Sequence, residues 1–186
     1  MAWRKCRIKK ITFSLILIFL INSFSVISTD AQRKKPTVKK AETYKTVREG
    51  VGIDGVTVGI STMADVVKKF GKNYVKKSYG KYSNSLNYSK LGLAFYYCQA
   101  DKSKEIFDIE IRAPYKAKTS KGVILGKSTL EEIYKIYGRS NDGLEYKGVS
   151  FFYANYKGKK TVTVIDIVEN GGIRQCDGNK NNQIGK

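Results

Sequence analysis

The chain has 186 residues, with 35 Lys and Arg against 16 Asp and Glu, a formal net charge of +19 and no histidine. The absence of histidine excludes Ser-His and Cys-His nucleophile pairs and removes the commonest transition-metal ligand. The glycines form neither a P-loop nor a dinucleotide-binding fingerprint, and two cysteines beyond the N-terminal region make a poor zinc site. Composition therefore predicts a binding protein with no catalytic residues, no metal site and no cofactor.

Residues 1–31 are a predicted secretory signal peptide. Five basic residues between Arg4 and Lys10 precede an apolar run from Ile11 to about Ile27, and Ala31 is a small residue at its exit. The alternative is a retained membrane anchor, but the run is short for a spanning helix and contains Ser and Asn. We expect cleavage after Ala31 and an exported protein, periplasmic or extracellular.

The mature chain remains strongly basic. Removal of residues 1–31 leaves 30 basic and 15 acidic residues, a net charge of +15. Outside the cytoplasm this charge indicates envelope polymers, lipid headgroups or acidic protein surfaces as partners rather than nucleic acid, unless it serves only solubility. Residues 32–50 are rich in Lys and Arg with almost no large apolar side chain, which predicts a flexible basic arm, and residues 173–186 predict a C-terminal tail of the same kind.

An internal repeat organises the middle of the chain. The stretches GVTVGISTMADVVKKFG (55–71) and GVILGKSTLEEIYKIYG (122–138) align without a gap and are identical at seven of seventeen positions. Each predicts a helix that ends at its last glycine. Ser128 and Glu131 are the predicted capping box of the second helix, and Ala64 replaces the glutamate in the first. The expected apolar stripes are Met63, Val66, Val67 and Phe70, and Leu130, Ile133, Tyr134 and Tyr137.

The similarity resumes downstream with a different offset. Residues 92–112 align with residues 148–168, so the first repeat carries eleven extra residues between its helix and this block. The extra residues fall in the Tyr- and Lys-rich segment 72–91, which predicts an extended loop around a short strand at Leu86. Such a loop either carries function or is a tolerated insertion.

Alternation in the aligned blocks predicts antiparallel strands with one core face and one open face. In the last strand of the first repeat the apolar residues alternate with charged ones, so the charged set faces outward. The predicted core set is Phe107, Ile109, Ile111, Leu93, Phe95, Tyr97, Val149, Phe151 and Tyr153. The predicted open set is Asp108, Glu110, Arg112, Ala94, Tyr96, Cys98, Ser150, Phe152 and Ala154.

Cys98 and Cys176 are the two cysteines of the mature chain. An even pair in an oxidising compartment predicts a disulfide, with two buried thiols or an exposed thiol as the alternatives. Because Cys98 falls on the open face, this bond would bring the segment 171–176 across the sheet of the first repeat.

The Gly-x-Ser-Thr helix start, the closing glycine, the antiparallel strands and the duplication together resemble the β-lactamase inhibitory protein-like fold, and are similar to small accessory lipoproteins of the outer-membrane barrel assembly machinery. The resemblance spans residues 55–169. It implies an α+β fold of two tandem helix-plus-antiparallel-sheet repeats, residues 51–115 and 116–172, which binds a protein partner through the open sheet face, as an inhibitor or envelope assembly factor. It implies no particular target enzyme. The implied contact residues are Tyr96, Phe152, Glu110 and Asp166.

Two other hypotheses remain from the residues themselves. In one, a basic protein holds an anionic envelope polymer or membrane surface through lysines interleaved with tyrosines. In the other, the acidic residues of the open face are the paired carboxylates of a hydrolase. The polymer-binding candidates are Lys72, Lys76, Lys77 and Lys81, and the carboxylate candidates are Asp108, Glu110 and Asp166.

Overall fold

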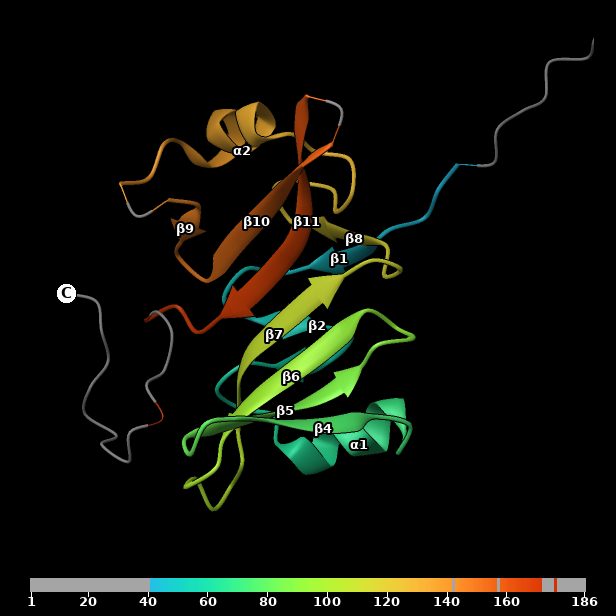
Figure 1. Ribbon diagram of the computed structural model, residues 1–186, viewed down its shortest axis with the longest axis vertical. Coiled ribbons are helices and arrows are strands. Elements are labelled where there is room, and N and C mark those ends of the chain that lie inside the picture. Colours follow the sequence, from blue (N-terminus) through green and yellow to red (C-terminus); the bar gives the residue numbers. More distant parts are fainter. Residues whose placement is uncertain (1–40, 142, 157, 172–175, 177–186) are drawn as a thin grey trace, which may run out of the picture. The chain divides into compact units, whose positions relative to one another are not determined.

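The computed structural model describes residues 41–141, 143–156, 158–171 and 176 (Figure 1). The predicted signal peptide, the first part of the basic arm and most of the C-terminal tail lie outside these residues. None of the helices in the described part of the chain is long and apolar enough to span a membrane.

A seven-stranded antiparallel sheet is the main element, with strand order β4-β5-β6-β7-β11-β10-β9. Figure 1 shows α1 at the β4 end of this sheet and α2 at the other end, and α1 packs on β6 while α2 packs on β11. Two small sheets, β1 with β8 and β2 with β3, complete the described fold. The strands are β1 Lys45–Val47, β2 Gly52–Ile53, β3 Val56–Thr57, β4 Val75–Tyr79, β5 Ser83–Tyr88, β6 Leu93–Cys98, β7 Ile106–Arg112, β8 Ala117–Thr119, β9 Glu145–Tyr146, β10 Val149–Tyr156 and β11 Lys159–Val168. The helices are α1 Met63–Phe70 and α2 Leu130–Tyr137.

The predicted α+β fold of two tandem helix-plus-antiparallel-sheet repeats is wrong. The described chain is β-rich, with two helices of only eight residues each. Moreover, β7 pairs directly with β11, with Ile111 opposite Ile165 and Ile109 opposite Ile167, so the strands of both halves form one continuous sheet. A two-turn helix covers little of a sheet, so the β elements dominate the buried core.

The predicted core face is mostly confirmed. Ile109 and Ile111 of β7 are fully buried in the same apolar cluster as Phe95 and Phe151. Phe107 is an exception, because the register of β6 and β7 shifts by one residue between Tyr96 and Tyr97. A bulge leaves one residue unpaired and changes the parity of the strand, and Phe107 is buried outside that cluster.

Tyr153 also departs from its predicted core position. It follows the register shift between β10 and β11 and is 43% exposed. The Lys160 ammonium lies 5.4 Å from its ring centroid, a cation–π distance. The core of this half therefore ends at Phe151 on β10.

In both helices the N-cap lies one residue later in the chain than predicted. The N-cap of α1 is Thr62, whose side chain accepts from the Asp65 amide, while the Asp65 carboxylate accepts from the Thr62 amide at 2.8 Å. The same capping box links Thr129 and Glu132 at the start of α2. The predicted Ser128 cap and the weaker first cap are therefore wrong, because Thr followed at three residues by Asp or Glu satisfies both amides in each helix.

Replacement of Thr129 by alanine is expected to lower the free energy of unfolding by about 1 kcal/mol, since it leaves first-turn amides of α2 without an acceptor. Urea denaturation measures the change. Thr163→Ala is the control and should change little, because this exposed threonine on β11 makes only a long hydrogen bond, 3.4 Å, to the Phe152 carbonyl. A loss at position 129 no larger than at position 163 would contradict the assignment of the cap.

The C-terminus of each helix is held by a tyrosine from the sheet. Gly71 and Gly138 have positive φ angles of 80° and 85°, where a side chain would be strained. The hydroxyl of Tyr88 donates to the Gly71 carbonyl at 2.8 Å, and that of Tyr146 donates to the Gly138 carbonyl at 2.7 Å. Both tyrosine rings also pack against the last aromatic residue of their helix. The predicted apolar stripes are thus confirmed as core contacts.

The predicted flexible arm over residues 32–50 is wrong for its last part. Lys45–Val47 form β1, which pairs in parallel with β8, and Val47 is fully buried. The Glu49 carboxylate accepts hydrogen bonds from the hydroxyls of Ser120 and Tyr137. Strand pairing, the burial of Val47 and the hydrogen bonds of Glu49 therefore hold this basic segment against the second half.

The predicted extended loop over residues 72–91 is also wrong, because it contains the hairpin of β4 and β5. All five residues of β4 are exposed, and no apolar alternation marks it as a strand. It is held by backbone pairing with β5, which is buried, and it ends at Gly80 with a φ of 64°. Strands of this kind have no sequence signal except the turn that follows them.

Candidate functional site

One face of the seven-stranded sheet gathers acidic and aromatic side chains. Tyr96 on β6 stands opposite Asp108 on β7, and Glu110 stands between Ala94 on β6 and Asp166 on β11. Directly opposed residues of antiparallel strands point to the same side of the sheet. The pairings of β11 with β7 and β10 extend this set. We name it the acid-aromatic face, and it consists of Tyr96, Asp108, Glu110, Arg112, Ser150, Phe152 and Asp166.

Glu110 is held in place by its neighbours. Its carboxylate accepts two hydrogen bonds from the Arg112 guanidinium, the one from Nη2 at 2.9 Å, and a longer one from the Tyr96 hydroxyl at 3.4 Å. The Arg112 side chain is 56% exposed, whereas that of Glu110 is 18% exposed. A bidentate guanidinium fixes both the position and the orientation of a carboxylate, so Glu110 is a preorganised acceptor at the middle of the face.

Asp108 and Asp166 each carry a buried oxygen, Oδ1, with no hydrogen-bond partner among the described residues. Burial raises the pKa of Asp108 well above its ordinary value, and the charges of Asp166 and Glu110 raise it further, against a hydrogen bond from the Ile109 backbone. Burial, followed by the charge of Glu110, raises the pKa of Asp166 to about 7, although Arg112 opposes the shift. In both carboxyl groups, burial and neighbouring negative charge therefore outweigh the contacts that favour the charged form.

The two predicted aromatic contacts differ in exposure. Phe152 is 54% exposed and is available to a partner. Tyr96 is half-buried, with its ring centroid 5.4 Å from that of Tyr79 and 6.4 Å from that of Phe107. Burial, a hydrogen bond with Tyr79 and the charge of Glu110 all raise the pKa of the Tyr96 phenol, which keeps its proton as a donor. Phe152 thus supplies apolar area, and Tyr96 supplies mainly a hydroxyl.

The face is less open than the alternation alone suggests. Five smaller or apolar residues of β6, β7 and β11 are only 2 to 7% exposed although they lie outside the main core cluster: Ala94, Cys98, Phe107, Val164 and Val168. Accessible surface is concentrated at Phe152 and at the Arg112 guanidinium. The carboxyl oxygens of Asp108 and Asp166 therefore lie beside, rather than within, the exposed part.

The arrangement favours the binding of a positive charge. A buried acceptor without a partner carries a desolvation cost that an incoming ammonium or guanidinium group would offset. No group of His, Cys, Asp and Glu residues suited to hold a metal ion is found among the described residues. A two-carboxylate hydrolase needs one carboxyl group held protonated beside one that is ionised, and raised pKa values at both Asp108 and Asp166 do not by themselves supply that pair.

The structure does not bring the four predicted polymer-binding lysines together. Lys76 and Lys77 are consecutive residues of β4, so their side chains point to opposite faces of the sheet. Lys72 precedes the strand and Lys81 lies in the turn after it, with its ammonium 5.0 Å from the Tyr82 ring centroid. All four are exposed, but they do not form one continuous patch on one face.

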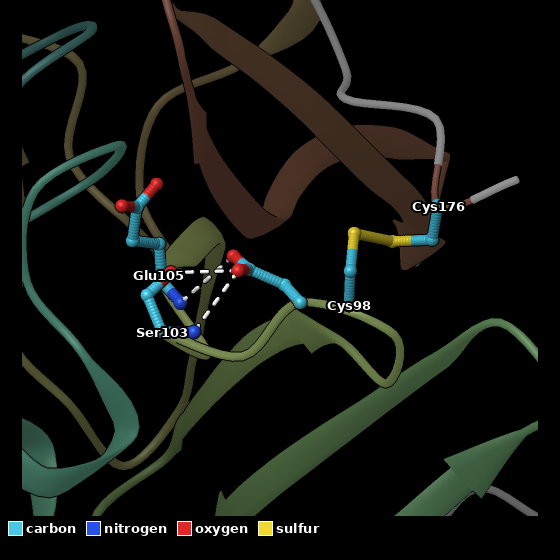
Figure 2. The surroundings of a disulfide bond; sticks show 5 residues. Cys98, Ser103, Glu105 and Cys176 are labelled. Atoms are coloured by element: carbon cyan, nitrogen blue, oxygen red, sulfur yellow. Dashed lines mark hydrogen bonds between the residues drawn. A yellow bond between two sulfur atoms is a disulfide. The ribbon is translucent and has the colours of Figure 1, made fainter. Parts of the chain in front are cut away.

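Cys98 and Cys176 form a disulfide, as predicted, with their Cα atoms 5.2 Å apart and a sequence separation of 78 (Figure 2). Such a bond is compatible with an oxidising compartment. It fixes the chain beyond β11 to the end of β6. The path expected for residues 172–175 lies outside the described residues.

Sequence reasoning left Asp108 and Arg112 out of the predicted protein contact. Both follow from the alternation of β7, which places them on either side of Glu110. Tyr79 had no such signal, because it contacts Tyr96 only through the unpredicted strand β4.

Comparisons of this chain with protein-family models, with curated proteins and with solved structures give no match.

Proposed function

We propose that this chain is an exported, non-catalytic binding protein that holds a protein partner on its acid-aromatic face. The partner inserts a Lys or Arg side chain toward Asp108, Glu110 and Asp166 and packs apolar surface on Phe152. Aromatic anchors beside a desolvated charged pair are the usual energetic centre of a protein interface.

The observation that carries this proposal is the pair of buried, unpartnered oxygens of Asp108 and Asp166 on the same face as an exposed phenylalanine. The chain is strongly basic overall, so a concentrated acidic centre gives the face an electrostatic character different from the rest of the molecule. Because raised pKa values favour the protonated forms of Asp108 and Asp166 in the free chain, charge complementarity acts on contact, when an incoming cation displaces the proton. It favours a partner whose contact surface is basic.

The split of Lys76 and Lys77 between two faces counts against the alternative in which these lysines hold an anionic polymer. Polymer binding would need a continuous basic surface and would weaken steeply with salt. Contact through a central buried charge should be much less sensitive to salt. The disulfide supports export, which remains part of the proposal.

Photo-cross-linking tests the proposal. A photoreactive phenylalanine analogue at position 152, expressed in the native cell, should capture a specific protein, and the same analogue at position 82 should not. Tyr82 is a matched control because it is an exposed aromatic residue, 47% accessible, in the turn before β5. Identification of the captured protein then allows direct binding measurements.

With the purified partner, Phe152→Ala and Asp166→Asn are each expected to weaken binding ten- to hundredfold, as for residues at the centre of an interface. Tyr82→Ala should leave the affinity unchanged. Equal capture at positions 152 and 82, or unchanged affinity of both variants, would overturn the proposal. A charge swap would identify the inserted cation. Asp166→Lys should abolish binding, and a change of the contacting basic residue of the partner to an acidic one should restore it.

A further inference from the structure

A second concave site lies on the opposite face of the sheet, at the β4 end. Its cavity, about 510 Å³ in volume, is lined by Lys76, Ser78, Asn84, Tyr97, Gln99 and Lys104. Cavities of roughly 300–1,000 Å³ are typical of small-ligand sites. None of the lining residues belongs to the acid-aromatic face, so the cavity is independent of the proposed protein contact.

The register of three strands builds the wall of this cavity. Ser78 on β4 stands opposite Asn84 on β5, which stands opposite Tyr97 on β6. Lys76 stands opposite Leu86, a core residue, and therefore points to the same side of the sheet as these three. Lys77, its neighbour in sequence, points to the other side.

The lining is rich in hydrogen-bond donors and contains no carboxylate. Lys76 and Lys104 bring two ammonium groups, and neither forms an ion pair with a carboxylate in the part of the chain that the structure describes. Ser78, Asn84, Gln99 and Tyr97 add hydroxyl and amide groups. Two unpaired cations among neutral donors form a site for an anion that carries several oxygen atoms.

The buried hydroxyl of Tyr97 is independent evidence for a ligand in the cavity. The residue is 1% exposed, and its hydroxyl oxygen is buried with no hydrogen-bond partner among the described residues. The hydroxyl of Tyr88, another buried tyrosine of the core, by contrast donates to the Gly71 carbonyl. A buried hydroxyl without a partner costs free energy unless something outside the described chain satisfies it.

Hydrogen bonds and the disulfide hold the loop between β6 and β7, which carries Gln99 and Lys104 (Figure 2). The Asp101 carboxylate accepts from the amide of Ser103 at 3.0 Å and from that of Glu105 at 3.4 Å, and the disulfide anchors Cys98 just before the loop. Lys104 has a φ of 52°, an uncommon conformation for a residue with a side chain. Its carbonyl accepts from the amide of Met63, the first residue of α1, at 2.9 Å. The backbone of Lys104 is thus held by its bond to α1 and by the Asp101 hydrogen bonds to the residues on either side.

We infer that this cavity binds a small polyhydroxylated molecule, of the size of a monosaccharide, through a phosphate or similar oxyanion. The two ammonium groups hold the oxyanion, and the Tyr97 hydroxyl donates to it. The amide side chains of Asn84 and Gln99 face the hydroxyl groups of the sugar or polyol. The same chemistry is offered by a free sugar phosphate and by a glycerophosphate lipid headgroup.

Isothermal titration of the purified mature chain with glucose 6-phosphate, inorganic phosphate and glucose tests this inference. Glucose 6-phosphate should bind, inorganic phosphate should bind more weakly, and glucose should not bind detectably. Co-sedimentation with phosphatidylglycerol vesicles forms a parallel arm. Vesicle binding that competes with glucose 6-phosphate assigns the headgroup as the source, and its absence assigns a free ligand.

Charge-matched variants separate this site from general basicity. Lys76→Gln and Lys104→Gln should each weaken glucose 6-phosphate binding about tenfold or more, because each removes a charge-assisted bond. Lys77→Gln and Lys102→Gln, neighbours in sequence that do not line the cavity, should have no effect. Tyr97→Phe should weaken binding several-fold without unfolding the chain. Equal losses at all four lysines, binding of glucose as tight as that of its phosphate, or no binding at all would overturn the inference.

Discussion

Replacement of both Cys98 and Cys176 by serine is expected to lower the free energy of unfolding by about 4 kcal/mol. The bond joins residues 78 apart, and this closed loop contains β7, α2 and the whole of β10 and β11. Without it the unfolded chain gains the conformational freedom of a long open loop, while the native sheet loses no strand pairing. Urea denaturation of the oxidised wild type and of the double variant measures the difference.

Wild-type protein reduced with dithiothreitol is the matched control, and its stability should equal that of the double serine variant. Peptide mapping without reductant confirms that the starting material is oxidised. A difference under 1 kcal/mol between oxidised and reduced protein would show that the bond does not constrain the unfolded chain, and would also weaken the case for an oxidising compartment.

Local features of the fold were predictable from sequence because they depend on residues close together in the chain. The apolar stripes of α1 and α2, the closing glycines and the core positions Ile109 and Ile111 all follow from periodicity. The disulfide followed from a count of cysteines. The errors at this level were small ones: the caps moved by one residue to Thr62 and Thr129.

The overall architecture was not predictable in the same way. The pairing of β7 with β11 joins strands about 55 residues apart, and no local pattern specifies which strand edges meet. Nor did β4 or β1 show the alternation of a half-buried strand, since the five residues of β4 are all exposed and β1 buries only Val47. The internal repeat therefore led to a prediction of two tandem helix-plus-sheet repeats, whereas the strands of both halves form one sheet.

The sequence predicted which strand residues share the face of the candidate site, but not how far each of them is buried. Alternation placed Tyr96, Glu110, Phe152 and Asp166 on one face, because side-chain parity is a local property. The burial of Asp166 depends on neighbouring residues of β7 and β10, and these neighbours are known only from the strand pairing. The cavity around Tyr97 was missed altogether, since it needs β4 and the loop after β6 together.

Replacement of Asp166 by asparagine is expected to stabilise the fold at neutral and alkaline pH while it weakens partner binding. The folded-state pKa of Asp166 is raised to about 7 from an ordinary 3.8, so between about pH 4 and pH 7 the unfolded chain has released this proton and the folded chain retains it. Stability therefore falls as pH rises through that window. Asparagine has the same shape without the charge, and the gain above pH 7 should be on the order of 4 kcal/mol.

The pH dependence of this gain identifies its origin. Urea denaturation at pH 4, 5.5 and 7.5 should give a difference between Asp166→Asn and wild type that is near zero at the lowest pH and grows with pH. Glu131→Gln, an exposed acidic residue on α2, should change the free energy of unfolding much less than Asp166→Asn at pH 7.5. A variant less stable than wild type at pH 7.5, or a constant difference at all three values, would mean that the Asp166 carboxyl has a partner in the folded chain. The proposed cation-binding role of the face would then lose its basis, because that role requires a buried carboxyl group that has no partner in the free chain.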